Sequence, residues 1–403
     1  MSGARVLVHA IEGAALGDGI GGLGGVLSQG ALDALSRRAV LLADEADTVV
    51  VDGAMDPGWL GFVRSLGLGT DRIEVARGGD GGLMDRVLGD AALLERLRGV
   101  GVVEGYMGSA GLARLGAVLA ARVMSAEVGL VDRLNLKSSL PGVLERAGVP
   151  TIESAIVARD AVMACVESMR SGGDVIVRAD VSIGGCGVWM IRGGEGVEAL
   201  ERGLARSMAD RLFTVQRLLD VDCSPNVQYR CGEGGAALVG VSDQRMTAEL
   251  AFVGNTWPSV MGGDAGLREQ SDRIVGVLVE DGYVGYVGID FIRTRGGEVF
   301  PIEINPRVNT STFAIEVAQR LGVGAFVLAT GVRVDPGLDF EGFARVVGDD
   351  LYADGVGVVP MTMAHAHRSA MDVMVFGDTL EEVQRIAERV TGVIEEGCAC
   401  AKG

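Results

Sequence analysis

The stretch GIDFIRTRGGEVFPIEINPRVNTS, residues 288–311, constrains the fold of this chain more than any other. Apolar and polar residues alternate on both sides of the glycine pair 296–297, a pattern typical of a half-buried β-hairpin. If the two glycines form a two-residue turn, four apolar residues share the face that packs on the core. These are Ile289, Phe291, Ile302 and Ile304.

The same register places two carboxylates directly opposite each other. Asp290 faces Glu303 on the second strand, and Gly288 faces Asn305. Like charges across a ladder repel, so we expect a cation between them. Two carboxylates and an amide, with space left by Gly288, suit Mg²⁺ shared with a polyphosphate. Arg307 follows directly and could hold a phosphate or a reacting oxyanion.

A plainer alternative is a solvated acidic face. In that case one carboxylate is simply neutralised by Arg307 or Arg293. The apolar residues of the same hairpin argue against it, because they indicate a packed, concave location.

The hairpin sequence resembles the signature of the ATP-grasp ligases, which place an acidic residue on one strand and Glu-x-Asn-x-Arg on the next. The resemblance extends along roughly residues 130–315 and implies the ATP-grasp fold, with ATP and Mg²⁺ as cofactors. It implies that Asp290, Glu303 and Asn305 are metal ligands and that Arg307 is catalytic.

Further positions match the phosphate-binding elements of that family. Lys137, in LNLKSSLPG, stands where the family has its first lysine. Arg178, in DVIVRAD, stands where a second lysine is usual. The resemblance implies that it binds phosphate and acts in catalysis, with the planar paired donors of a guanidinium in place of a single ammonium. A glycine-rich flap follows at Ser182, Gly184, Gly185 and Gly187. Taken alone, the flap is only a β-turn and Lys137 only a surface lysine.

The stretch RLFTVQRLLDVDCS matches the hinge strand that addresses the nucleotide base and ribose. Gln216 stands where the family commonly has Glu, while Leu218 and Leu219 would supply backbone contacts. Gln228 and Gln244 resemble polar positions that line the active-site sheet.

Near the N-terminus, Gly17, Gly19 and Gly22 fit the G-x-G-x-x-G spacing of dinucleotide-binding proteins. Asp44 or Glu45, after an expected strand AVLLA, could supply the acidic residue that such a site needs. The glycines exceed what a tight turn requires, and the later signature is more specific. We therefore interpret residues 17–25 as a flexible loop near a substrate pocket.

The whole chain is predicted to be α/β and α+β. Residues 1–125 form a Rossmann-like pre-ATP-grasp domain, residues 126–330 the ATP-grasp domain with a mobile lid at about 150–212, and residues 331–403 a small α/β cap. Its N-terminal third resembles that of the pre-ATP-grasp peptide ligases of the pheganomycin type.

That resemblance implies an ATP-dependent carboxylate–amine ligase of natural-product biosynthesis. An acyl phosphate would form from a small carboxylic or amino acid and react with an amine or peptide. Two alternatives stay open: acyl transfer to a thiol such as a carrier protein, and a non-catalytic ATP-binding protein.

Composition supports small-molecule partners. The net charge of −18 opposes binding to nucleic acid or an anionic membrane. Lacking a signal-like run, the protein is expected to be cytoplasmic, with a homodimer left open. The six cysteines are expected to be reduced thiols.

A few polar residues have two interpretations. Asn309, Ser311 and Thr312 could contact substrate or phosphate, or simply cap a helix. His365 and His367 would share one face of a strand, and two imidazoles without a third ligand are expected at the surface or at a pocket rim rather than in a metal site.

Overall fold

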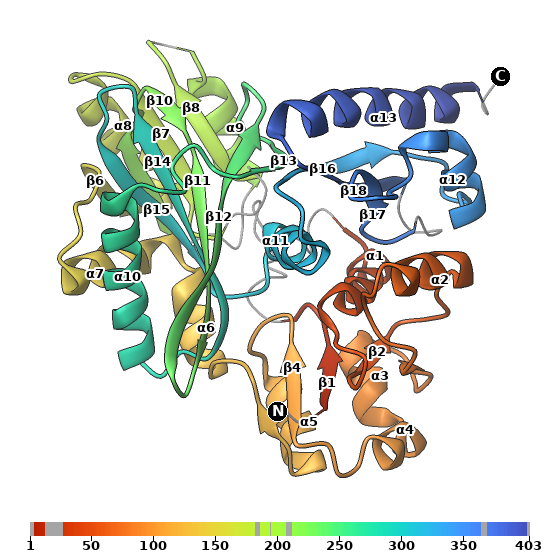
Figure 1. Ribbon diagram of the computed structural model, residues 1–403. Coiled ribbons are helices and arrows are strands. Elements are labelled where there is room, and N and C mark those ends of the chain that lie inside the picture. Colours follow the sequence, from red (N-terminus) through yellow and green to blue (C-terminus); the bar gives the residue numbers. More distant parts are fainter. Residues whose placement is uncertain are drawn as a thin grey trace.

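The structure is a computed structural model of the chain. It describes residues 4–12, 27–181, 186–193, 195–206, 212–363 and 369–400, with side chains described as far as residue 396. Figure 1 shows the N-terminal part beside the C-terminal strands, with the central sheet and a smaller sheet on the other side.

The N-terminal part is a five-stranded parallel sheet in the order β3-β2-β1-β4-β5. The strands are short and rich in valine, as expected for a sheet covered on both faces. They are β1 (Arg5–Val8), β2 (Thr48–Val51), β3 (Ile73–Val75), β4 (Val102–Gly105) and β5 (Arg122–Val123). Helices around this sheet are α1 (Gln29–Ala34), α2 (Pro57–Ser65), α3 (Leu83–Gly89), α4 (Ala91–Arg96) and α5 (Ala110–Leu119). The predicted Rossmann-like arrangement is confirmed.

One predicted strand is wrong. Residues 39–42 of AVLLA end a 3-10 helix, Leu35–Leu42, and Ala43 is its C-cap; the five residues of this run are at most 2% exposed. It packs against β2 and against α11 (Thr310–Leu321), so both of its sides are buried. A short apolar run buried all round carries no periodicity that separates a strand from a helix.

A small antiparallel sheet in the order β6-β9-β7-β8 spans the region expected as a lid. Its strands are β6 (Ser154–Ala158), β7 (Val175–Ala179), β8 (Val188–Ile191) and β9 (Leu212–Arg217). Two helices, α8 (Val162–Arg170) and α9 (Val197–Arg206), cover one face and form a separate hydrophobic core with it. The other face of this sheet is turned to the central pocket.

The central sheet contains nine antiparallel-paired strands among the described residues. In spatial order they are β10 (Val221–Cys223), β14 (Gly285–Thr294), β11 (Pro225–Gly232), β12 (Gly235–Met246), β13 (Phe252–Trp257), β16 (Ala325–Arg333), β18 (Ala370–Gly377) and β17 (Gly357–Pro360), with β15 (Val299–Asn305) paired to β14. The expected C-terminal cap thus contributes β17 and β18 to this sheet. The limits of the domains stay a prediction.

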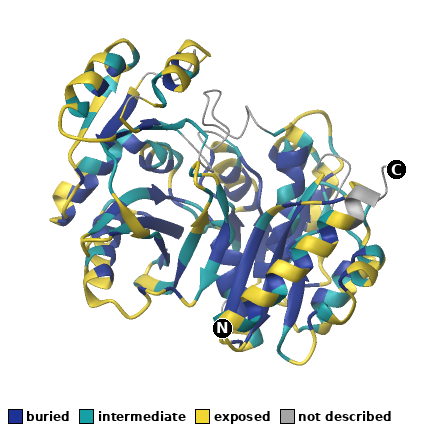
Figure 2. Cartoon of the chain, turned by 90° about the horizontal axis from the view of Figure 1, so that it is seen from above, coloured by how far each residue is buried: buried dark blue, intermediate teal, exposed yellow. Residues whose placement is uncertain are grey.

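Helices cover both faces of the central sheet. On one face α10 (Ala265–Glu280) packs with α7 (Leu140–Ala147), close to α6 (Val128–Asn135). On the other lie α11 and, over the C-terminal strands, α13 (Leu380–Cys400) with α12 (Phe340–Val347). Figure 2 shows the buried strands between helices whose outer faces are exposed. No described helix is long and apolar enough to cross a membrane.

We expect Gly254→Ala to lower the free energy of unfolding by about 2–4 kcal/mol. Gly254 lies in β13 with φ +137°, and an added Cβ would lie 1.8 Å from the carbonyl oxygen of Leu328 in β16. The substitution would push apart the seam that joins the C-terminal strands to the rest of the sheet. Urea denaturation measures the change.

Gly263→Ala is the matched control, because nothing lies within 4 Å of its added Cβ. It should change stability by less than about 0.5 kcal/mol. Equal effects of the two substitutions would contradict the packing described at the seam.

Candidate active site

The predicted pairing of the carboxylates is confirmed. In the β14–β15 hairpin Asp290 is the partner of Glu303, and Gly288 is the partner of Asn305. Asp290 and Asn305 are each 6% exposed. The solvated acidic face considered as an alternative is therefore wrong, and Arg293 binds Asp222 instead.

The predicted two-residue turn is wrong, although the register at the site is right. The N–H of Thr294 donates to the carbonyl of Glu298, so three residues form the loop. A β-bulge then shifts the register between Asp290 and Phe291, which compensates for the longer loop. The bulge turns Ile302 toward the pocket, whereas Ile289, Phe291 and Ile304 lie in the core as predicted.

Three cations surround Glu303. The ammonium of Lys137, on the short helix after α6, lies 3.0 Å from Glu303 Oε1. Arg178, from β7, and Arg307, after β15, add positive charge nearby. Burial alone would raise the pKa of Glu303, but Lys137, Arg307 and Arg178 together hold it below its ordinary value. Lys137 is 5% exposed, so it is a buried site residue rather than a surface lysine, and burial lowers its pKa.

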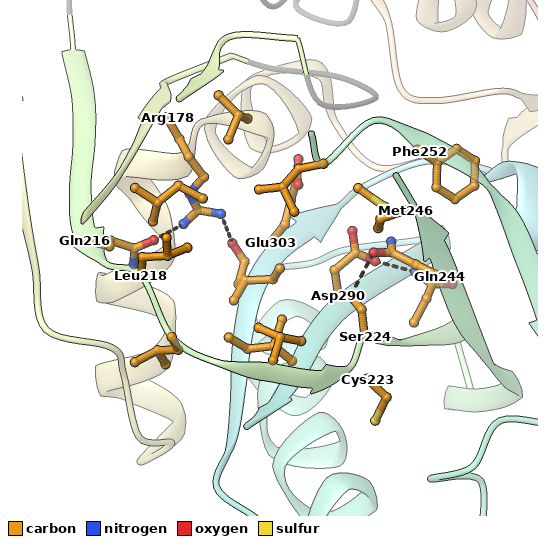
Figure 3. A pocket seen from close by; sticks show the side chains of 18 of the residues that line it. Arg178, Gln216, Leu218, Cys223, Ser224, Gln244, Met246, Phe252, Asp290 and Glu303 are labelled. Atoms are coloured by element: carbon orange, nitrogen blue, oxygen red, sulfur yellow. Dashed lines mark hydrogen bonds between the residues drawn. The ribbon is translucent and has the colours of Figure 1, made fainter. Parts of the chain in front are cut away.

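Asp290 is held by amides instead of cations. Asn305 Nδ2 donates to its Oδ2 at 3.0 Å, and Asn226 Nδ2, from β11, donates to its Oδ1. Gln244, from β12, also binds this carboxylate (Figure 3). Burial and the charge of Glu303 raise the pKa of Asp290 to about 6, despite these hydrogen bonds.

A buried polar network supports these amides. Asn226 Oδ1 accepts from Gln228 Nε2 at 2.7 Å and from Ser311 Oγ at 2.9 Å. Thr312 Oγ1 donates to Gln228 Oε1 at 2.9 Å. Gly288 makes the arrangement possible, since an added Cβ would lie 2.0 Å from Asn309 Nδ2 and 2.5 Å from Gln228 Nε2.

Asn309, Ser311 and Thr312 lie at the start of α11. Asn309 is the N-cap of α11, and its backbone N–H donates to Thr312 Oγ1 at 2.9 Å. The capping role is therefore correct for these two residues. Ser311 lies in the polar network and, with Asn309, also lines the pocket.

Arg307 is fixed from two sides. Its Nη2 donates to Asn305 Oδ1 at 2.6 Å and its Nη1 to Asn135 Oδ1, at the end of α6, at 2.8 Å. The backbone of Arg307 pairs with Met107, and Val308 N–H donates to the carbonyl of Tyr106. The loop after β4 of the N-terminal sheet thus borders the site.

These groups line a pocket of about 930 Å³. The hinge residues Gln216, Leu218 and Leu219 lie in its wall, as does Gln244, whereas Gln228 is fully buried beneath it. Gln216 Oε1 accepts from Arg178 Nη2 at 2.5 Å, and Arg178 Nη1 donates to the carbonyl of Ile302 at 2.9 Å. The predicted site residues outside the flap therefore converge on one cavity.

Gly187 precedes β8 with φ +73°, and its carbonyl accepts from Ala179 N–H at 2.8 Å. Ser182, Gly184 and Gly185 lie outside the described residues, as do His365, His367 and the glycines at 17–25.

The acidic residue proposed for a dinucleotide site is not at a strand end, because AVLLA is no strand. Asp44 binds Arg320 and Arg5. The second strand of the sheet, β2, is followed by Asp52, which binds Arg37 at 2.7 Å. These ion pairs disfavour a ribose-binding role for either aspartate.

Sequence reasoning missed Asn135 and Asn226. Their positions could have indicated them. Asn135 stands two residues before Lys137, and Asn226 stands two residues before Gln228 and so lies on the same face of the strand.

The oxygen donors suit a hard divalent cation. No group of three His, Cys, Asp or Glu residues that could hold a metal occurs in the described part of the chain. Two carboxylates and the amide oxygen of Asn305 nevertheless fit Mg²⁺, which is commonly held by one or two carboxylates with phosphate and water completing its shell. Burial and the charge of Glu303 raise the pKa of Asp290, so a positive charge beside this carboxylate would be favourable.

Comparison with known families gives a match over this region. Residues 152–311 match the model of a family described as an ATP-grasp domain. No curated protein sequence gives a significant match to the chain.

Solved structures with the ATP-grasp fold resemble the whole chain. N5-carboxyaminoimidazole synthetase from Staphylococcus aureus aligns with a TM-score of 0.61 at 12% identity, over 96% of this chain and 97% of that one. The biotin carboxylase domain of Hydrogenobacter thermophilus 2-oxoglutarate carboxylase aligns with a TM-score of 0.61 at 15% identity, over 96% and 89%. Carboxyaminoimidazole ribonucleotide synthase from Aspergillus clavatus gives 0.60 at 12% identity, over 98% and 99%. At these identities the likeness shows the fold, and it confirms the predicted ATP-grasp fold class.

We expect Lys137→Met to lower the free energy of unfolding at pH 7 by about 2–4 kcal/mol, because it leaves the Glu303 carboxylate without its closest cation. The pKa of Glu303 is lowered in the folded protein, so its ionised form contributes stability above its ordinary pKa, and this contribution is lost as the pH falls through the lowered value. The effect of Lys137→Met should therefore shrink at acidic pH. Thermal or urea unfolding at pH 7 and at low pH measures it.

Adding Glu303→Gln to Lys137→Met should recover part of the loss at pH 7. Arg345→Met, in an exposed ion pair with Glu341, is the control and should cost less than about 0.5 kcal/mol. A pH-independent loss in Lys137→Met would contradict the assigned ion pair.

Proposed function

We propose that this protein is an ATP-dependent carboxylate–amine ligase that forms an amide through an acyl phosphate. The observation that carries the proposal is the convergence on one pocket of paired carboxylates and three cations from separate elements. A carboxylate pair for metal and cations for phosphate are what phosphoryl transfer needs.

Two further observations support the binding of ATP and Mg²⁺ in this pocket. Residues 152–311 match an ATP-grasp domain model. Neighbours with the same fold were crystallised with ADP, with ATP, or with MgADP and bicarbonate. We therefore assign ATP and Mg²⁺ to this pocket. Bound Mg²⁺ would neutralise the phosphate oxygens.

Each site residue has a defined task in this proposal. Asp290, Glu303 and Asn305 hold the metal, and Lys137 and Arg178 bind phosphate oxygens. Gln216, with Leu218 and Leu219, borders the base and ribose. Arg178 replaces the usual lysine with two donors in a fixed plane, one of which orients Gln216.

The chemistry then requires two steps. A carboxylate oxygen of the acid attacks the γ-phosphorus, the bond to the β-γ bridging oxygen breaks, and ADP leaves. The amine attacks the acyl carbon, its proton is lost, and phosphate leaves with the oxygen that came from the acid. Arg307, held by Asn135 and Asn305, would stabilise the oxyanion formed in that second step.

The proposed type of acceptor and the proposed pathway rest on the resemblance of the N-terminal third to the pheganomycin-type ligases. We propose an amine or peptide acceptor, a natural-product pathway and a cytoplasmic location. The net charge of −18 favours an amine over an acidic carrier protein as acceptor. Intact metal-ligand positions favour an enzyme over a non-catalytic ATP-binding protein.

The test is ADP release from ATP and Mg²⁺ with a panel of carboxylic and amino acids, each with and without an amine. ADP release should require a particular acid and amine and should yield a new amide mass. Asp290→Asn and Glu303→Gln should each lower kcat/KM by about 100-fold or more. Turnover that survives both substitutions would contradict the assignment of the metal ligands.

Activity should fall as the pH drops through about 6. The pKa of Asp290 is raised to about 6, so below this pH a proton occupies the carboxylate that must bind the metal. Because proton and metal compete, a tenfold higher Mg²⁺ concentration should shift the acidic limb by up to about one pH unit downward. A kcat/KM profile that stays flat from pH 5 to 8 would refute this role of Asp290.

A further inference from the structure

The pocket has two apolar lobes, one on each side of the carboxylates. The first, here called the hinge lobe, contains Ile176, Met190, Leu218 and Ile292. The second, here called the hairpin lobe, is formed by the β12–β13 hairpin with Met246, Leu250 and Phe252. In Figure 3 Leu218, Gln216 and Arg178 lie on one side of Glu303, while Met246 and Phe252 lie beyond Asp290 on the other. The proposed nucleotide occupies the hinge lobe, so the hairpin lobe has no assigned occupant.

Strand register directs the hairpin lobe at the pocket. Gln244 pairs with Asn255, and both line the pocket. Met246 lies two residues after Gln244 and so points to the same face. A register shift after Arg245 pairs Met246 with Phe252, which returns Phe252 to that face as well. Two large apolar side chains therefore face the pocket side by side.

Leu250 adds a third apolar side chain at an energetic cost. Its φ is +62°, in the left-handed region that favours glycine. The tight loop is closed by Thr247, whose Oγ1 accepts from the N–H groups of Glu249 and Ala251. Backbone strain of this kind persists where a side chain supplies something that glycine cannot. Here the Leu250 side chain lines the pocket.

The hairpin lobe is also uncharged. From residue 224 to 255 the described pocket-lining side chains are polar or apolar, without a formal charge. Met246 is 38% exposed and is paired with Phe252, so the two side chains form a continuous apolar surface in the pocket. A charged or very small acid would leave this surface uncovered.

We propose that the hairpin lobe binds the apolar side chain of the carboxylic acid substrate, whose carboxylate lies between the lobes beside Asp290 and Arg307. The substrate class is thus a monocarboxylic acid with an aliphatic or aromatic group, not bicarbonate. This inference rests on the proposed function, since it takes the acid as the group that ATP activates.

The test uses hydroxylamine as the amine and measures hydroxamate and ADP with acetate, butyrate, hexanoate, phenylacetate and bicarbonate. Across the aliphatic series kcat/KM should rise by about fourfold for each methylene that is buried. Met246→Ala should lower kcat/KM for hexanoate about tenfold or more and change that for acetate less than twofold. Met190→Ala, the matched control in the hinge lobe, should instead raise KM for ATP.

Leu250→Gly separates a structural from a specificity role. Glycine relieves the left-handed strain, so the melting temperature should stay equal or rise. KM for hexanoate should nevertheless increase several-fold. An unchanged KM would show that Leu250 is not part of a substrate subsite.

Direct binding separates failure of this inference from failure of the proposed function. Calorimetry with hexanoate in the presence of MgADP should show binding that Met246→Ala weakens and Met190→Ala does not. Hexanoate binding without hydroxamate formation would support the hairpin lobe as a substrate subsite and would contradict the proposed ligase activity. Hydroxamate formation that depends neither on chain length nor on Met246 would contradict the proposed subsite and would be consistent with the proposed ligase activity.

Discussion

The structure depends on the burial of two carboxylates that face each other across one hairpin. Asp290 is buried and Glu303 is half-buried, and their charges repel. Such a pair is tolerated only when other groups compensate each charge. Cations compensate Glu303 and amide donors compensate Asp290, and they come from elements far apart in the chain. The groups that satisfy this pair or support its partners thus come from the lid sheet, from the chain around the end of α6 and from α11.

The two carboxylates are compensated differently, and this difference has a chemical use. Lys137 and its neighbours keep Glu303 ionised, whereas Asp290 binds a proton more readily than an ordinary aspartate. A site prepared in this way attracts further positive charge on the side of Asp290. It also lies between two apolar lobes, so a nucleotide and an organic acid can approach the same carboxylates from opposite directions.

Sequence reasoning identified the hairpin because two constraints agreed there. The alternation of apolar residues and the position of the glycines both placed Asp290 opposite Glu303, and the structure has that pairing. The assumed turn was nevertheless wrong, since a longer loop and a bulge at Ile302 compensate for each other. Neither feature changes the period of the pattern, so neither was visible in the sequence.

Other features could not be predicted because they depend on tertiary contacts. The run at 39–43 is buried on every side, which removes the periodicity that distinguishes helix from strand. Asn135 and Asn226 are ordinary polar residues in the sequence and acquire a role only when folding brings them to Arg307 and Asp290. Spacing along the chain carries little information about such contacts between distant elements.

The most direct test of the account follows one oxygen atom. An acid substrate labelled with ¹⁸O in its carboxylate is turned over with ATP and an amine, and the released phosphate is analysed by mass spectrometry. Attack of the carboxylate on the γ-phosphorus predicts one ¹⁸O atom in the phosphate for each amide formed. Phosphate without label, or label in AMP, would show that the pocket does not activate the acid as an acyl phosphate.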